Sequence, residues 1–274
     1  MSGLTAQLAM CDTAFVETAS LDGTVVGWDE SGSGQPLLLI HGGATDSGVW
    51  SLVRPLLPLG LRVAAMDRRG RGRSGHGETL HSLEAEADDV LSVAAALGGG
   101  VIVAGHSIGA TIALQALRRS DGLICAAALY EPPLPAMTPQ APVAMTEALD
   151  AGKAEEAFTV FLRDIVRLSD REISALRASP MWEKRVALIW TMRRELQSLA
   201  SHDPDVARYG EIQVPVQLLV GTNTASHHTE AIRALAKVIP NIEITSLEGQ
   251  GHTALVQAPQ LVAGAIMQLL RRID

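Results

Sequence analysis

Short apolar runs alternate with amphipathic segments along most of the chain. Runs too short for helices predict buried strands at residues 36–40, 61–66, 101–104, 123–129, 214–220 and 242–245. Two further strand-like segments, 14–18 and 24–28, flank a turn at Asp22-Gly23. Apolar residues recur at helical spacing in 82–97, 111–119 and 259–271. Strands that alternate with helices indicate an α/β fold in which helices cover both faces of a mostly parallel sheet.

The pattern changes after Glu131. Prolines are frequent between residues 132 and 142, and from 143 to about 200 the apolar spacing is helical only. Strand patterns resume at residue 214. A length of 274 residues suits one α/β domain with an insertion. We therefore expect a core of residues 1–131 and 207–274 and a helical lid at 132–206.

The strongest chemical motif is the segment 105–109, which reads Gly-His-Ser-Ile-Gly. It follows a predicted buried strand and precedes a predicted helix, which is the context that a G-x-S-x-G motif needs to expose its serine. The glycines allow the sharp turn, and the serine between them can hold a strained backbone conformation. Ser107 is therefore the predicted nucleophile.

Three other segments accompany this motif in order along the chain. His41-Gly42-Gly43 follows the strand that ends at Ile40, residues 67–74 read D-R-R-G-R-G-R-S, and residues 249–252 read G-Q-G-H. Together the four segments resemble the α/β-hydrolase superfamily over nearly the whole chain, least of all in the lid. The resemblance implies a mostly parallel eight-stranded sheet and a helical lid inserted after strand six.

The resemblance also implies roles for several residues. A serine nucleophile needs a base, and His252 lies in the loop where the family carries it. The oxyanion needs preorganised N–H donors, here the backbone N–H groups of Ile108, directly after the nucleophile, and of Gly43. The remaining histidines receive more ordinary interpretations. We expect His41 and His106 to brace the motif loops, and His227 and His228 to lie at the surface or face the lid.

The third catalytic group departs from the family pattern. The family usually carries an aspartate after strand seven, but Thr224 occupies that position and cannot hold a negative charge. Glu131 follows the strand 123–129, at the sheet edge where catalytic groups gather, and Pro132 and Pro133 fix the backbone after it. Haloalkane dehalogenases and certain lactonases carry their acid after strand six, so Glu131 is the predicted acid. The alternatives are Asp67, Glu230, Glu248, or a purely structural Glu131 that pairs at the lid hinge.

The composition of the chain argues against several classes of binding partner. A net charge of −8 disfavours nucleic acid. The two cysteines have no disulfide or metal-site spacing, and we expect neither metal nor organic cofactor. No apolar run reaches the length of a membrane span, and the first ten residues lack the pattern of a targeting signal. The sequence thus predicts a cytoplasmic protein without a membrane partner, and it leaves the oligomeric state open.

Methionines and aromatic residues concentrate in the predicted lid. They indicate an apolar, adaptable pocket. The candidates for its lining are Met137, Met145, Phe158, Phe161, Leu162, Met181, Trp182, Trp190 and Met192, together with Trp50 beside the oxyanion loop. The arginines of residues 67–74 are Arg68, Arg69, Arg71 and Arg73. We expect them to be solvated or paired rather than to form an anion site.

These elements predict a serine hydrolase that cleaves a small, largely apolar carboxylic ester or lactone through an acyl-enzyme on Ser107. Cleavage of a C–C bond and peracid formation use the same groups and stay open. A different class is also open, because the missing aspartate suits a ligand-binding protein or a non-hydrolytic tailoring enzyme on a hydrolase scaffold.

Overall fold

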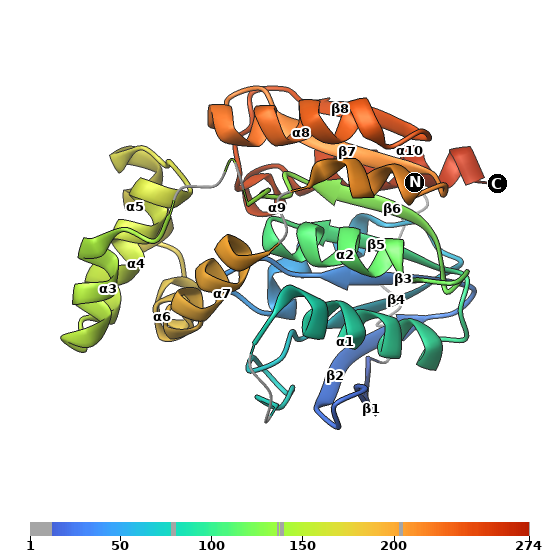
Figure 1. Ribbon diagram of the computed structural model, residues 1–274, viewed down its shortest axis with the longest axis horizontal. Helices are drawn as coiled ribbons and strands as arrows, with labels where there is room; N and C mark the ends of the chain where they lie inside the picture. The colour runs from blue at the N-terminus through green and yellow to red at the C-terminus, as the bar shows by residue number, and fades with distance from the viewer. Residues whose placement is uncertain (1–12, 78–80, 136, 138–139, 203–204, 274) are drawn as a thin grey trace, which may run out of the picture.

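The computed structural model describes residues 13–77, 81–135, 137, 140–202 and 205–273 (Figure 1). The N-terminal segment considered as a targeting signal lies outside these residues. Within them, eight strands form a single sheet. The strands are β1 (Ala14–Ala19), β2 (Val25–Gly32), β3 (Gln35–Ile40), β4 (Leu61–Met66), β5 (Val101–His106), β6 (Ile124–Tyr130), β7 (Val216–Gly221) and β8 (Ile242–Leu247).

The strand order is β1-β2-β4-β3-β5-β6-β7-β8. Strand β2 runs antiparallel to both β1 and β4, and the other neighbouring pairs are parallel. This confirms the predicted fold class, an α/β-type sheet that is mostly parallel. In β5 and β6, His106 pairs with Tyr130 at the last position of each strand. The next residues, Ser107 and Glu131, therefore leave the sheet from adjacent strand ends.

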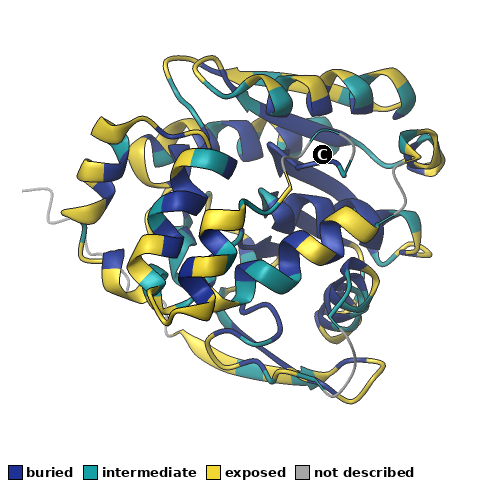
Figure 2. Cartoon of the chain, turned by 60° about the vertical axis from the view of Figure 1, so that its left-hand side comes forward, coloured by how far each residue is buried: buried dark blue, intermediate teal, exposed yellow. Residues whose placement is uncertain are grey.

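Side chains alternate between two apolar layers, because successive residues of a strand point to opposite faces. On β3, Leu38 and Ile40 join the layer under α1 (Leu83–Ala96), α2 (Ile108–Arg118) and α8 (Ser226–Val238). Leu37 and Leu39 join the layer under α9 (Ala254–Gln257), α10 (Pro259–Ile273) and the short helices η1 (Ser47–Trp50) and η2 (Arg54–Leu56). Figure 2 shows the central strands buried, with helices exposing only their outer sides.

A group of helices stands apart at one end of the sheet (Figure 1). These helices connect β6 to β7 and have an apolar cluster of their own, to which Phe158, Trp182 and Met192 belong. They are α3 (Val143–Asp150), α4 (Ala154–Val160), the π-helical turn η3 (Phe161–Ile165), α5 (Asp170–Arg177), α6 (Trp182–Ala187) and α7 (Trp190–Ser201), and the short helix η4 (Val206–Glu211) follows them. In the part of the chain that the structure describes, no helix combines the length and apolar character needed to cross a bilayer.

The turn that carries Ser107 packs directly against the backbone of β3. A Cβ atom added to Gly109 would lie 2.3 Å from the backbone oxygen of His41, far inside van der Waals contact. We expect Gly109→Ala to lower the melting temperature by at least about 5 °C or to prevent folding, because two backbones would have to separate. Thermal unfolding followed by circular dichroism measures this effect.

The matched control is Gly264→Ala in α10. A Cβ atom there meets nothing within 4 Å, and alanine is the better helix former. This variant should unfold at the wild-type temperature or slightly above it. Equal melting temperatures for the two variants would contradict the role assigned to the Gly109 contact.

Candidate active site

Ser107 lies on a tight turn between β5 and α2. Its backbone angles are φ 54° and ψ −131°, a conformation that is strained for a residue other than glycine. The Ser107 N–H donates to the backbone oxygen of Tyr130 at 2.9 Å, and the Ser107 backbone oxygen accepts from Ala110 at 2.8 Å. The strained conformation is thus held from both sides, by the neighbouring strand and by the first turn of α2.

His252 is hydrogen-bonded to Glu131. The imidazole Nδ1 lies 2.6 Å from Glu131 Oε2, and the other carboxylate oxygen accepts the N–H of Gly221 at 2.8 Å. Glu131 is fully buried and has a φ of 46°, which turns the chain sharply after β6. Among the predicted acids, Glu131 is therefore the one that lies against His252. Glu230 and Glu248 are exposed, and Asp67 instead accepts the backbone N–H groups of Ser47 and Arg73.

Neighbouring side chains hold the loop that carries His252. The His106 ring donates through Nε2 to the backbone oxygen of His252 at 2.9 Å, and the Tyr130 hydroxyl donates to the backbone oxygen of Gly251. His41 braces the first motif in a similar way. Its Nδ1 donates to the Gly42 oxygen at 2.8 Å, and its Nε2 accepts the Arg68 N–H at 3.0 Å. The prediction that His41 and His106 brace the loops is confirmed.

Two backbone N–H groups beside Ser107 are available to a ligand. Gly43 and Ile108 line the same cavity as Ser107 and His252. Within the described residues, neither N–H donates to a protein acceptor. Ile108 is the first residue of α2, so the positive end of that helix also faces the cavity. The cavity therefore combines a hydroxyl, an imidazole and two free amide donors.

Apolar side chains form most of the remaining wall. They come from the segment after Glu131, from η3 and its end, and from α7. The residues are Pro133, Phe161, Ile165, Val166, Met192, Leu196 and Leu199. Phe161 and Met192 were predicted from the lid sequence, whereas Ile165, Leu196 and Leu199 were not, because aliphatic residues in an amphipathic helix are equally expected in its packed core.

The four pocket residues favoured by the sequence do not line this cavity. Trp50 is buried in the apolar layer under α10, Trp190 is 49% exposed, and Met137 packs against the core layer under α2. These three predictions are wrong, because residue type alone does not tell which side of a helix or loop faces the cavity. Trp182 lines a second cavity, which Arg185 and Thr45 share with it.

His228 was expected at the surface or facing the lid; it is not at the surface but lies in the wall of the Ser107 cavity, together with residues of η3 and α7. It is buried, and its ring stacks on His252 at a centroid separation of 4.3 Å and an angle of 10°. Neither ring nitrogen has a hydrogen-bond partner among the described residues. His227 lines the cavity beside it. The sequence offered little to find them, since they sit in the first turn of α8 without a motif.

Glu131, His228 and His252 are close enough together to raise the question of a metal ion. In the described chain their ligand atoms all lie within 4.8 Å of one another. However, the rings of His228 and His252 are stacked and nearly parallel. Each ring nitrogen binds a metal through a lone pair in the plane of its ring, and lone pairs in two parallel planes do not point at one ion. Glu131 also already bonds His252. The geometry favours a hydrogen-bonded Glu131–His252 pair with His228 stacked on it over a metal centre.

Burial sets the protonation of the pair. It lowers the pKa of His252 to about 3, and the nearby charges of His227 and Arg185 act in the same direction. Burial raises the pKa of Glu131, while the charge of His228 and the Gly221 N–H oppose that rise. A neutral His252 with Nδ1–H bonded to Glu131 leaves Nε2 as a free proton acceptor. The imidazole can thus act as a base at neutral pH.

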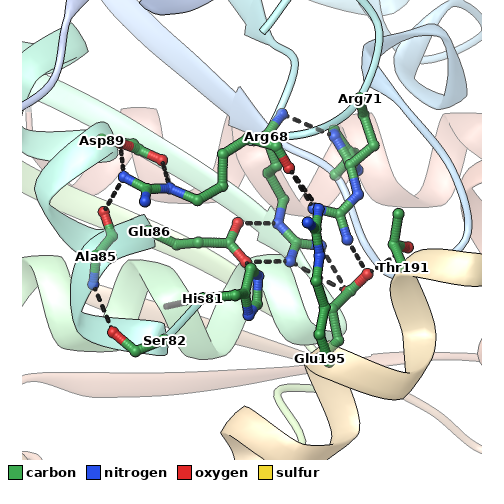
Figure 3. Close-up of polar contacts among 12 residues, drawn as sticks. Arg68, Arg71, His81, Ser82, Ala85, Glu86, Asp89, Thr191 and Glu195 are labelled. Carbon is green, nitrogen blue, oxygen red and sulfur yellow. Dashed lines mark hydrogen bonds and ion pairs between the residues drawn. The ribbon is translucent and has the colours of Figure 1, made fainter. Parts of the chain in front are cut away.

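A buried ionic network fastens α7 beside this site (Figure 3). Arg68 contacts Glu86 of α1 at 2.6 Å and Glu195 of α7 at 3.1 Å, and its Nη1 donates to the Gly42 oxygen at 3.0 Å. Arg71 also pairs with Glu195. One guanidinium thereby joins α1, α7 and the loop that contains Gly43.

The other two arginines of this loop are paired as well. Arg69 binds Asp89 at 2.7 Å, and Arg73 pairs with Asp29 near the surface. Paired arginines were expected. The alternative that they are solvated is wrong for Arg68, Arg69 and Arg71, which are at most 2% exposed.

Four histidines with lowered pKa make stability depend on pH. Burial lowers the pKa of His106 and His252 to about 3, and those of His41 and His228 well below 6.5. The unfolded chain therefore binds more protons below pH 6.5, and stability is lost as the pH falls through that value. Each such group costs about 2 kcal/mol between pH 6.5 and 5. Melting temperatures should fall steadily from pH 7.5 to 5.

His228→Phe provides the comparison, since it keeps an aromatic ring against His252 but cannot be protonated. Its melting temperature should fall less over the same pH range. The raised pKa values of Glu131 and Asp89 act in the opposite sense, but they are two groups against four histidines. A wild-type melting temperature that stays constant or rises toward pH 5 would show that the buried histidines do not control the pH dependence.

Comparison with known proteins connects this geometry to a family. The model of the Alpha/beta hydrolase family matches residues 37–265. A non-heme haloperoxidase of Rhodococcus erythropolis is 37% identical over 171 residues, which cover 60% of this chain and 59% of that protein. A pimeloyl-[acyl-carrier protein] methyl ester esterase of Aromatoleum aromaticum is 27% identical over 86% of this chain and 98% of its own. The crystal structure of an alpha/beta hydrolase from Sphaerobacter thermophilus superposes with a TM-score of 0.81 at 28% identity, covering 93% of this chain and all of that one.

Proposed function

The chain belongs to the alpha/beta hydrolase family, and from this premise we propose that it is a serine hydrolase that cleaves a small, largely apolar carboxylic ester or lactone. The observation that carries the proposal is the 2.6 Å contact between Glu131 and His252, in the wall of the cavity that holds Ser107. It supplies the acid that the sequence lacks at Thr224. We assign Ser107, His252 and Glu131 as the catalytic triad.

The chemistry follows from these positions. His252 Nε2 accepts the proton of the Ser107 hydroxyl as its oxygen attacks the ester carbonyl carbon. Protonated His252 is stabilised by Glu131, then gives the proton to the departing alcohol oxygen as the C–O bond breaks. Water next attacks the acyl-enzyme, with His252 again taking and returning the proton. Serine and the acid product are released, and no redox change occurs.

The charge that develops on the carbonyl oxygen needs donors that are already in place. The N–H groups of Gly43 and Ile108 are free in the described structure and line the cavity, which supports their assignment as the oxyanion hole. Donors held by a rigid backbone need no reorganisation during the reaction. The Arg68 bond to the Gly42 oxygen supports this rigidity at one of the two donors.

The residues that line the cavity support the proposal of a small, largely apolar substrate. Its polar side chains are Ser107 and the histidines 227, 228 and 252, and the other side chains are apolar. Apolar walls from α7 and η3 would bury an acyl or alkyl group and exclude bulk water. We propose that residues 132–206 act as the lid that supplies these walls, over a core of residues 1–131 and 207–274.

Peracid formation is a second candidate for the same residues. The relative from Rhodococcus erythropolis is a non-heme haloperoxidase. Hydrogen peroxide that replaces water as the attacker of the acyl-enzyme would release a peracid, which is able to oxidise halide. Competition between water and hydrogen peroxide for one acyl-enzyme would distinguish the two reactions. Hydrolysis of a C–C bond would use the same groups.

Ser107→Ala tests the proposed function directly. The wild type should hydrolyse short-chain p-nitrophenyl esters, and the variant should lose at least about 10,000-fold in kcat, because nothing else in the cavity supplies the attacking oxygen. Release of p-nitrophenol measures the rate. Tight ester binding without turnover in the wild type would overturn the hydrolase and favour a ligand-binding protein.

Two substitutions compared in one assay test the acid. Glu131→Gln removes the charge that stabilises protonated His252 and should lower kcat roughly 1,000- to 10,000-fold. The Thr224 hydroxyl helps to lower the pKa of Glu131, but its loss in Thr224→Val removes one neutral contact only, so we expect less than about a tenfold effect. The reverse ranking would remove Glu131 from the triad.

A further inference from the structure

Arg185 of α6 is a partly buried cation without a counter-charge. Its Nε donates to the backbone oxygen of Ala44 at 3.4 Å, and its guanidinium carbon lies 5.3 Å from the centre of the Phe158 ring. Among the residues that the structure describes, no carboxylate pairs with it, and burial alone lowers its pKa to about 10. A guanidinium has five N–H donors, so most of these donors have no acceptor within the described residues.

Three other cations of the helical segment 132–206 pair with carboxylates. Lys184, the preceding residue, pairs with Asp46 at 2.5 Å. Arg177 pairs with Glu155 at 3.2 Å, and Arg193 with Asp150 at 2.7 Å. Partial loss of hydration is unfavourable for a cation that no carboxylate neutralises, and the acidic side chains that pair with these three cations do not reach Arg185. A bound anion would therefore stabilise this guanidinium.

The position of Arg185 connects it to the reaction site. Arg185 and Thr45 line one cavity, and Gly43 lines the cavity of Ser107. The short loop 43–45 thus contributes to both cavities, and the Ala44 oxygen between them accepts from Arg185. The charge of Arg185 also reaches across this loop, since it lowers the pKa of His106 and of His252.

We propose that Arg185 binds a carboxylate of the substrate, so that the preferred substrate is an ester or lactone with an acid group at one end of a short apolar body. This inference rests on the proposed function and names its substrate class. The planar guanidinium fits a carboxylate with two parallel hydrogen bonds. The acid end would occupy the cavity beside Thr45, and the scissile carbonyl would lie across the loop at the N–H of Gly43.

A matched pair of esters tests this assignment. The monoester p-nitrophenyl hydrogen adipate carries a free carboxylate, and p-nitrophenyl methyl adipate has the same chain with the charge removed. The ratio of kcat/KM for the acid ester to that for the neutral ester reports recognition of the charge. We expect the wild type to favour the acid ester and Arg185→Met to lower the ratio roughly 10- to 100-fold, as for loss of a charge-assisted hydrogen bond.

Two control variants separate recognition from lid packing. Lys184→Met removes the adjacent cation, which already has a partner, and should leave the ratio unchanged. Arg185→Lys keeps the charge but not the two parallel bonds, and should retain part of the ratio. An equal ratio in the wild type and in Arg185→Met overturns the proposal. If Arg185→Met does not fold, a wild-type ratio of one or less overturns it.

A binding measurement keeps this test independent of catalysis. Ser107→Ala should bind monomethyl adipate, measured by calorimetry, at least about tenfold more tightly than Ser107→Ala combined with Arg185→Met. Failure of the wild type to hydrolyse either ester would reject the proposed function, and the binding comparison would then decide the role of Arg185 alone. Equal binding by the two proteins would reject that role.

Discussion

The guanidinium of Arg68 joins the three parts from which the site is built. It lies between Glu86 of α1 and Glu195 of α7 and also donates to the Gly42 oxygen, one residue before a proposed oxyanion donor. All three charged side chains are almost fully buried. Burial of such ions is unfavourable, so each one depends on the others, and loss of one leaves an unpaired charge. Helices α1 and α7 and the loop 42–43 are therefore held in one arrangement.

The sheet brings the proposed reacting groups together through the ends of its strands. Parallel β5 and β6 end side by side, which puts Ser107 and Glu131 at adjacent strand ends, and the loop after β8 brings His252 to Glu131. Both Ser107 and Glu131 have positive φ. Backbone hydrogen bonds to neighbouring elements and the hydrogen bond from the Gly221 N–H to the Glu131 carboxylate hold these strained turns. The strain sits where side chains must leave the sheet edge and point into one cavity.

The features of the fold and the site that the sequence predicts correctly are those determined by residues close together in the sequence. Apolar runs mark buried strands, and the glycines around Ser107 mark the sharp turn. Glu131 stands out because it follows a strand closely and Thr224 cannot serve as the acid. The positions of Trp50 and His228 depend instead on how separate elements pack. Trp50 lies under α10 on the far face of the sheet, and His228 meets His252 only because α8 packs beside the last loop. No periodicity in one segment contains that information.

Cations that already pair with a carboxylate of the protein differ from Arg185, which in the described structure is free to bind an anionic ligand. Arg68, Arg69 and Lys184 each meet a carboxylate of the protein, so an added anion would have to displace an existing partner. Arg185 has no such competitor in the described chain and bonds the oxygen of Ala44, beside the proposed oxyanion donor. Partial burial of this guanidinium strengthens its attraction for an anion relative to that of a fully solvated cation. On the proposal above, this guanidinium would hold the acid end of a substrate beside the loop where the carbonyl would be aligned.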